Sequence, residues 1–197
     1  MVPRHRRITR PPLALPRAIR RPFAVESRAV IRFFILFLVL QAALFGAELT
    51  PWAQQYFVVP WTNTLATISA WLVTLFDADV VATGKLLRST ASGFAVSIEA
   101  GCNGVEATIV LVAAIFAFPA PWTSRLIGLT AGIAAVQGLN VIRVISLFYL
   151  GQWNFDVFEW AHLYVWQALI MLDVLVVWLI WVRTLPGADG APDAAPA

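Results

Sequence analysis

Long apolar runs constrain this chain more than any other feature of its sequence. Val30–Ala47, Leu126–Leu150 and Leu163–Val182 are rich in Leu, Ile, Val and Phe. About 20 such residues in a helix cross the hydrocarbon core of a bilayer, where backbone groups find no water and must bond within the helix. A shorter run, Val105–Phe118, predicts a fourth span. The chain is 60% hydrophobic, with nine tryptophans and a mean hydropathy of +0.77, which excludes a soluble domain.

Two segments between the first and second of these four spans are more polar. Trp61–Phe76 carries six Thr, Ser and Asn residues and predicts a helix in the outer interface, with an additional span as the alternative. Val80–Ile98 has turn residues around Gly84 and Gly93 and an alternating pattern, which predicts a short extracytoplasmic β-hairpin. The expected fold class is therefore an all-α polytopic membrane protein. It has about four transmembrane helices, one interfacial or additional helix and this hairpin.

The two ends of the chain differ from its middle. Nine of the 14 basic residues lie between Arg4 and Arg32, and prolines are frequent there. We interpret residues 1–29 as a cytoplasmic arm that orients the first span and contacts anionic membrane lipids, rather than nucleic acid. Residues 30–183 form the membrane domain, and residues 184–197 form a disordered tail. No cofactor or metal is expected.

Cys102 is the only cysteine, so a disulfide or CxxC centre within the chain is excluded. Gly101 and Gly104 flank the segment around it. Asn103, followed by Glu106 three residues later, predicts a helix N-cap with its capping-box partner. A helix N-terminus favours an anion such as a thiolate. The alternative is that Cys102 is an inert, small, buried side chain.

Alternating helix directions place two further unusual residues on the same side of the membrane as Cys102. Arg143 lies seven residues before the end of its span. Residues 151–156 end that helical run, and a loop is predicted over Gln152–Trp160. His162 follows this loop and opens the last span. An arginine inside a span suggests a functional site, with Asn140 as a residue that orients it. The alternatives are an Arg143–Asp173 ion pair and an interfacial histidine without a special role.

Cysteine, histidine and arginine together support nucleophilic acyl chemistry. His162 would take the thiol proton and return it to the leaving amine, and Arg143 would stabilise the oxyanion. The blocks Ala-Gly-Cys-Asn-Gly at 100–104 and Asn-Val-Ile-Arg at 140–143, with the later His162, resemble the exosortase and archaeosortase family of membrane cysteine transpeptidases. The resemblance covers about residues 60–182, and the short chain is similar to compact members such as the exosortase H type. Asn103 stands where the family more often has Ser.

The resemblance implies catalytic roles for Cys102, Arg143 and His162, with Asn103, Gly104 and Asn140 in support. Substrates would be exported proteins that end in a short motif, a transmembrane helix and a basic cluster, and the new C-terminus would pass from a thioester to an acceptor. The implied location is the inner membrane, with the site facing outward. The alternatives are a non-catalytic subunit or small transporter built on Arg143 and Asp173, and a thiol-dependent acyltransferase acting on lipid.

Overall fold

The structure is a computed structural model that describes residues 21–185. The predicted arm up to residue 20 and the tail from residue 186 lie outside the described residues. The elements are α1 (Arg21–Glu48), α2 (Pro51–Ala53), the π-helical turn η2 (Gln54–Val58), α3 (Val59–Thr74), β1 (Val80–Thr83), β2 (Leu86–Ser89), β3 (Ala95–Ser97), α4 (Val105–Ala117), α5 (Trp122–Trp153), α6 (Phe155–Trp160), the π-helical turn η3 (Ala161–Val165) and α7 (Trp166–Arg183). Helix α1 thus begins inside the range predicted as the arm.

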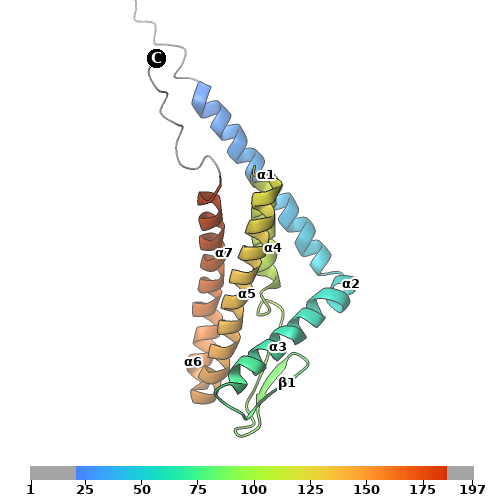
Figure 1. The fold of residues 1–197 in the computed structure, drawn as a ribbon, viewed down its shortest axis with the longest axis vertical. Helices are drawn as coiled ribbons and strands as arrows, with labels where there is room; N and C mark the ends of the chain where they lie inside the picture. The colour runs from blue at the N-terminus through green and yellow to red at the C-terminus, as the bar shows by residue number, and fades with distance from the viewer. Residues whose placement is uncertain (1–20, 186–197) are drawn as a thin grey trace, which may run out of the picture.

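A helical bundle of α1, α4, α5 and α7 forms one half of the molecule (Figure 1). Three helical segments are long and apolar enough to cross a membrane: 27–48, 122–153 and 155–183. The fourth predicted span is α4, whose 13 residues rise about 20 Å, less than the ~30 Å hydrocarbon core. Four full-length spans are therefore not found in the described part of the chain. Helix α4 is short because Gly104 precedes it and Pro119 follows its last turn.

The bundle has its own apolar core, made by one face each of α4, α5 and α7. Its buried members are Ala107, Leu111, Ile115, Val136, Ile170, Val174 and Trp181. Phe33 of α1 joins at the edge and contacts the rings of Phe118 and Trp178. The first half of α1, the end of α4 and the second half of α7 therefore lie at the same end of the bundle.

A second core surrounds the C-terminal half of α5. It joins the buried face of α3 to the sheet and to α5, and consists of Leu65, Ala66, Ala70, Val73, Val80, Leu87, Ile98, Val144 and Phe148. Helix α3 crosses obliquely at this end of the molecule (Figure 1). It confirms the predicted helix over Trp61–Phe76, within two residues at each end, and is not among the helices long enough to span.

The predicted hairpin is a three-stranded antiparallel sheet in the order β1-β2-β3. Two glycines explain the difference. Gly84 (φ +58°) turns the chain between β1 and β2, and Gly93 (φ +75°) turns it between β2 and β3. Because each glycine adopts a left-handed conformation that suits a tight turn, the segment has two turns and therefore three strands.

The loop predicted over Gln152–Trp160 is also wrong. Helix α5 continues to Trp153, and only Asn154 leaves the helical conformation before α6 begins. The Asn154 side chain accepts hydrogen bonds from the backbone N–H groups of Asp156 and Val157. This N-cap starts a new helix at once, so His162 lies two residues past α6, in the π-helical turn η3, on a continuous helical path rather than after a loop.

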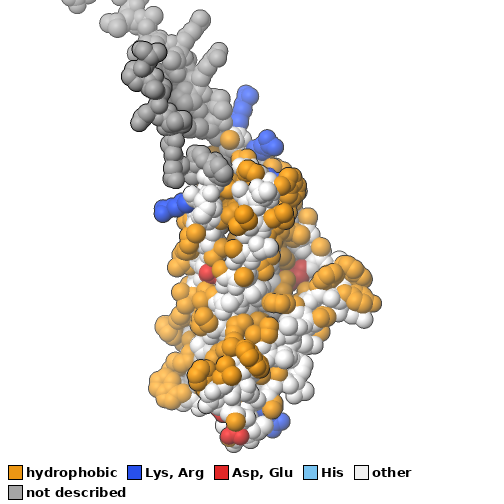
Figure 2. Space-filling model, viewed as in Figure 1, with side chains coloured by type: hydrophobic (Ala, Val, Ile, Leu, Met, Phe, Trp, Pro, Cys, Tyr) orange, Lys and Arg blue, Asp and Glu red, His pale blue; other side chains and the backbone are white. Residues whose placement is uncertain are grey.

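The surface fits a membrane-embedded bundle (Figure 2). Large apolar side chains of α1 and α7, such as Phe34, Leu38, Leu172 and Ile180, are more than half exposed. Patches of this extent on a protein surface mark contact with lipid or protein. Arginines gather at the end of the bundle opposite the sheet: Arg28, Arg32, Arg125 and Arg183 lie in the first half of α1, the first turn of α5 and the last turn of α7.

Two glycines of α5, four residues apart on one face of the helix, permit close packing. A Cβ on Gly128 would lie 2.3 Å from the Trp181 indole nitrogen, and one on Gly132 would lie 2.8 Å from Leu111. The Trp181 ring is held in place because its N–H donates to the carbonyl of Ser124 at 2.8 Å. The indole therefore cannot move aside without losing this hydrogen bond.

We expect Gly128→Ala to destabilise the fold by about 1–3 kcal/mol, the usual cost of overpacking a core. Gly138→Ala is the matched control, because it lies in the same helix with no atom within 4 Å of the new Cβ. It should be neutral or stabilising, since alanine favours helices over glycine. Thermal unfolding in detergent measures both variants. Equal midpoints for the two would contradict the packing assigned to Gly128.

Candidate active site

The loop before α4 presents Cys102 between two glycines in left-handed conformations, Gly101 (φ +80°) and Gly104 (φ +73°). The N-cap of α4 is Gly104, whereas the sequence predicted Asn103. Asn103 still accepts a hydrogen bond from the N–H of Val105 at 3.0 Å, and Glu106 accepts one from the N–H of Gly101. The predicted capping box therefore does not form: Gly104 caps α4 without a side-chain hydrogen bond, and Glu106 binds the N–H of Gly101 instead of that of Asn103.

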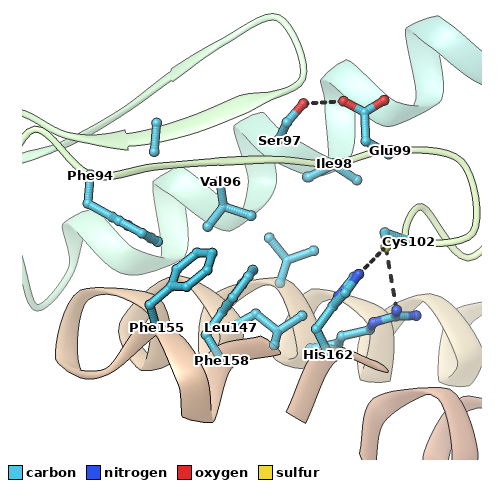
Figure 3. A pocket seen from close by; sticks show the side chains of 13 residues that line it. Phe94, Val96, Ser97, Ile98, Glu99, Cys102, Leu147, Phe155, Phe158 and His162 are labelled. Atoms are coloured by element: carbon cyan, nitrogen blue, oxygen red, sulfur yellow. Dashed lines mark hydrogen bonds between the residues drawn. The ribbon is translucent and has the colours of Figure 1, made fainter. Parts of the chain in front are cut away.

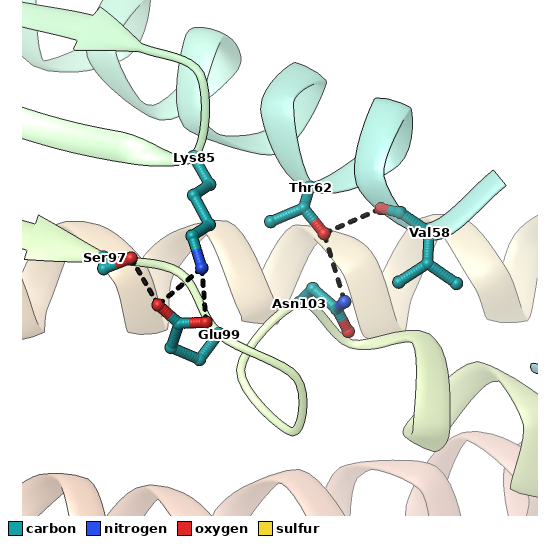
Figure 4. Close-up of polar contacts among 6 residues, drawn as sticks. All are labelled: Val58, Thr62, Lys85, Ser97, Glu99 and Asn103. Atoms are coloured by element: carbon teal, nitrogen blue, oxygen red, sulfur yellow. Dashed lines mark hydrogen bonds and ion pairs between the residues drawn. The ribbon is translucent and has the colours of Figure 1, made fainter. Parts of the chain in front are cut away.

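Helices α3 and α5 hold this loop from two sides. Asn103 is 1% exposed, and its side-chain amide donates to the hydroxyl of Thr62 at 3.1 Å (Figure 4). The backbone carbonyl of Asn103 accepts a hydrogen bond from the indole N–H of Trp61 at 3.1 Å. On the other side, Gln137 donates to the carbonyl of Gly104 at 3.0 Å. The loop on the C-terminal side of the thiol is therefore fixed by three hydrogen bonds to neighbouring helices, two to its backbone carbonyls and one from the Asn103 side chain.

Arg143 reaches the loop from the middle of α5 and is 2% exposed. One terminal nitrogen of its guanidinium donates to the carbonyl of Gly101 at 3.2 Å, and the other lies 3.4 Å from the Cys102 sulfur. The Arg143–Asp173 ion pair considered above does not form, and among residues 27–185 the only ion pair joins Lys85 to Glu99. Arg143 thus places a positive charge beside the thiol.

His162 approaches the same sulfur from the last helical segment. Its Nε2 lies 3.8 Å from Cys102 Sγ (Figure 3). The imidazole stacks on the ring of Phe158, with 5.8 Å between centroids and 5° between planes. His162 belongs to the π-helical turn η3, and such turns are common at functional sites. The structure therefore brings together the three residues that the sequence singled out.

A cavity of about 230 Å³ opens onto these three side chains. Its walls are mainly apolar and come from the segment 94–99, from α5 and from α6, with Phe94, Phe155 and Phe158 among them (Figure 3). Sequence reasoning did not assign these aromatic residues to the site. For Phe155 and Phe158, the Asn154 cap with Asp156 after it was the signal of a helix that could have placed them.

Burial raises the pKa of the Cys102 thiol, the charge of Arg143 opposes this shift, and Glu106 and Glu99 add to it. Since the net shift is upward, the resting thiol is mainly neutral near pH 7, contrary to the thiolate that the helix N-terminus favours. A neutral thiol needs a base to become a nucleophile. The imidazole nitrogen of His162 is within a small movement of this proton.

The contacts of Asn140 and Glu99 were not predicted from the sequence. The side-chain amide of Asn140 is fully buried, makes no hydrogen bond in the described structure and therefore does not orient Arg143. It packs beside Gly104, where a Cβ would lie 3.1 Å from its nitrogen. Glu99, which had no predicted role, accepts hydrogen bonds from Lys85 and Ser97, and these hold its carboxyl pKa below the usual range (Figure 4).

The fold and this cluster define a helical, membrane-spanning protein with a cysteine, a histidine and an arginine converging on one cavity. The family model for the transmembrane exosortase (Exosortase_EpsH) matches residues 23–181, and the chain belongs to this family. The match confirms the resemblance seen in the sequence; membership of the exosortase H type stays a prediction. Searches of curated proteins and of solved structures gave no match.

Proposed function

We propose that this chain is a membrane-embedded cysteine transpeptidase. It cuts the C-terminal sorting signal of exported proteins, forms a thioester on Cys102 and transfers the new C-terminus to an acceptor. Its substrates are exported proteins that carry a short motif, a transmembrane helix and a basic cluster at their C-terminus. Membership of the exosortase family supports this reaction class.

One observation carries the proposal: the Cys102 sulfur lies 3.8 Å from His162 Nε2 and 3.4 Å from an Arg143 nitrogen. These are the neighbours that a thiol needs for acyl transfer, namely a base for its proton and a fixed positive charge. The adjoining cavity gives a peptide carbonyl access to the sulfur. Cys102 is partly buried and Arg143 is almost fully buried, and removal from water strengthens electrostatic stabilisation.

The residues suggest a definite path for each proton. The thiol proton passes to His162 Nε2 as the sulfur attacks the peptide carbonyl carbon, and Arg143 stabilises the oxyanion. The C–N bond then breaks, the amine leaves with the proton from His162, and a thioester remains on Cys102. An acceptor nucleophile attacks the thioester, gives its proton to His162 and releases the sulfur, which recovers that proton.

We place the site on the extracytoplasmic side of the inner membrane. The support is the distribution of arginine: Arg28, Arg32, Arg125 and Arg183 belong to one end of the bundle, and the sheet, Cys102 and His162 belong to the other part. Basic residues near span ends favour the cytoplasm. Lys85 and Arg88 lie on the sheet side. The end with four arginines is therefore the more basic one, and we assign it to the cytoplasm.

The transporter alternative depended on an intramembrane pair of Arg143 with Asp173. Arg143 instead donates to Gly101 and to the Cys102 sulfur, and the buried Asp173 Oδ2 makes no hydrogen bond among the described residues. The arginine is therefore committed to the thiol loop, which favours the peptidase reading.

The thioester tests the proposal directly. An exported protein with the C-terminal signal is co-expressed with this chain, and the membranes are quenched in acid. We expect a covalent adduct of the chain with the shortened protein that neutral hydroxylamine releases and that maps to Cys102 by mass spectrometry. Prior alkylation of Cys102 is the matched control and should prevent both adduct and cleavage. Unchanged cleavage after complete alkylation would refute the thioester mechanism.

A further inference from the structure

Strand β3 is an edge strand with one side unpaired. Its ladder with β2 pairs Leu86 with Ser97 and Arg88 with Ala95. The N–H of Ser89 donates to the carbonyl of Phe94, and the N–H of Ile98 donates to the carbonyl of Lys85. In an antiparallel ladder the residues that bond to the neighbour alternate with residues that face away. The backbone groups of Ala95 and Ser97 therefore point away from β2, and among residues 21–185 they have no partner.

The unpaired side of β3 faces the cavity of the candidate active site. Six consecutive residues, 94–99, line this cavity. Successive side chains of a strand point to opposite faces of the sheet, so a cavity that touches all of them must run along the edge of the strand. The other edge is occupied by β2. The free N–H and C=O groups of Ala95 and Ser97 are thus directed along the space that opens onto the thiol.

The strand also leads straight to the nucleophile. Only Ile98 to Gly101 separate the end of β3 from Cys102, and the N–H of Cys102 donates to the carbonyl of Glu99 at 2.9 Å. Across the cavity, α6 and η3 present Phe155, Phe158 and His162 to the strand (Figure 3). A chain lying between these walls passes the sulfur and the imidazole together.

We propose that the substrate segment containing the scissile bond binds as an added strand on β3, pairing with the backbone of Ala95 and Ser97. This inference rests on the proposed function and specifies how the substrate is held. Strand addition uses backbone hydrogen bonds for affinity and pockets for alternate side chains for selectivity. Here the aromatic wall receives every second side chain of the bound segment, and an extended backbone places its carbonyl beside Cys102.

Proline substitutions test the pairing. Ala95→Pro removes an N–H that faces the cavity without removing a bond to β2, and proline is tolerated in edge strands at such positions. Loss of one hydrogen bond, with the ring intruding on the edge, should slow signal removal at least about fivefold. Ala91→Pro is the matched control, because Ala91 lies in the exposed turn before β3, and it should process normally. Wild-type processing by Ala95→Pro overturns the inference, provided that Cys102→Ala is inactive.

Disulfide trapping gives a second test that does not depend on proline. The double variant Ala95→Cys with Cys102→Ala keeps one thiol, placed on the strand edge, and cannot form the thioester. A substrate with single cysteines scanned through the segment before its transmembrane helix is trapped under mild oxidation. Crosslinks at every second position support an added strand. Spacings of three to four residues, or no crosslinks, overturn it, whereas normal processing by Cys102→Ala alone overturns the proposed function instead.

Discussion

Cys102→Ala is expected to slow removal of the C-terminal signal by about 10⁴-fold or more, which leaves only uncleaved substrate in cells. The magnitude follows from losing the nucleophile of a unit whose members act together, where single removal costs nearly as much as removing all of them. The substrate gives the measurement: its electrophoretic mobility in intact cells reports whether the signal has been removed. His162→Ala should have a similar but smaller effect of about 10²–10⁴-fold, the usual contribution of a general base.

The fold should survive the loss of the thiol. The Cys102 side chain contacts Arg143 and His162, while the loop is held by backbone and side-chain groups of Asn103 and Gly104. Thermal unfolding of Cys102→Ala should therefore match the wild type. Asp173→Asn is the contrasting control, and it should process substrate normally. Inactivity of Asp173→Asn together with full activity of Cys102→Ala is the pattern that a transporter would give.

The sequence was sufficient to find the three central residues. Hydropathy gave the span boundaries, and alternating helix directions then placed Cys102, Arg143 and His162 on one side of the membrane. The structure places them in contact because the loop before α4 and the π-helical turn η3 both lie beside the middle of α5, from which Arg143 reaches the sulfur. The distances between helices depend on side-chain packing, such as that of Gly128 against Trp181. From one sequence, the spacing of glycines indicates that helices can approach closely, but not which residue packs against them.

Two elements were predicted wrongly, each because of a short local feature. The segment 155–160 mixes acidic and aromatic residues, so it resembled a loop, yet one N-cap at Asn154 starts a helix there. Likewise, Gly84 and Gly93 were recognised as turns, but one hairpin was predicted where two turns require three strands. At Asn154 a short local signal outweighed the average polarity of the segment, whereas in the sheet the second turn was recognised without the strand that it adds. Strand β3, which coincides with the alternating pattern recognised in the sequence, is the one that lines the cavity.

Arg143→Lys is expected to slow signal removal by about 10²–10³-fold, the cost of removing one donor from an oxyanion site. The guanidinium spans two atoms, the carbonyl of Gly101 and the sulfur of Cys102. Lysine keeps the charge but ends in a compact ammonium on a different stem and cannot reproduce this fork. Arg125→Lys is the matched control in the same helix. Arg125 donates to the carbonyl of Phe118 and lies over the ring of Trp122, so its replacement should leave processing unchanged.

The pH dependence of Cys102 alkylation separates the charge of Arg143 from its geometry. This charge lowers a thiol pKa that burial raises, so Arg143→Gln should raise the pKa further and shift the alkylation rate profile to higher pH. Arg143→Lys retains the charge and should shift the profile less, although both variants lose processing. In the wild type, the midpoint of the alkylation rate profile should lie above the pKa of a free cysteine, which is near 8.5. The reason is that a thiol with a raised pKa yields less thiolate at any given pH. Normal processing by Arg143→Lys would show that a positive charge beside the sulfur is sufficient, and would remove the guanidinium fork from the mechanism.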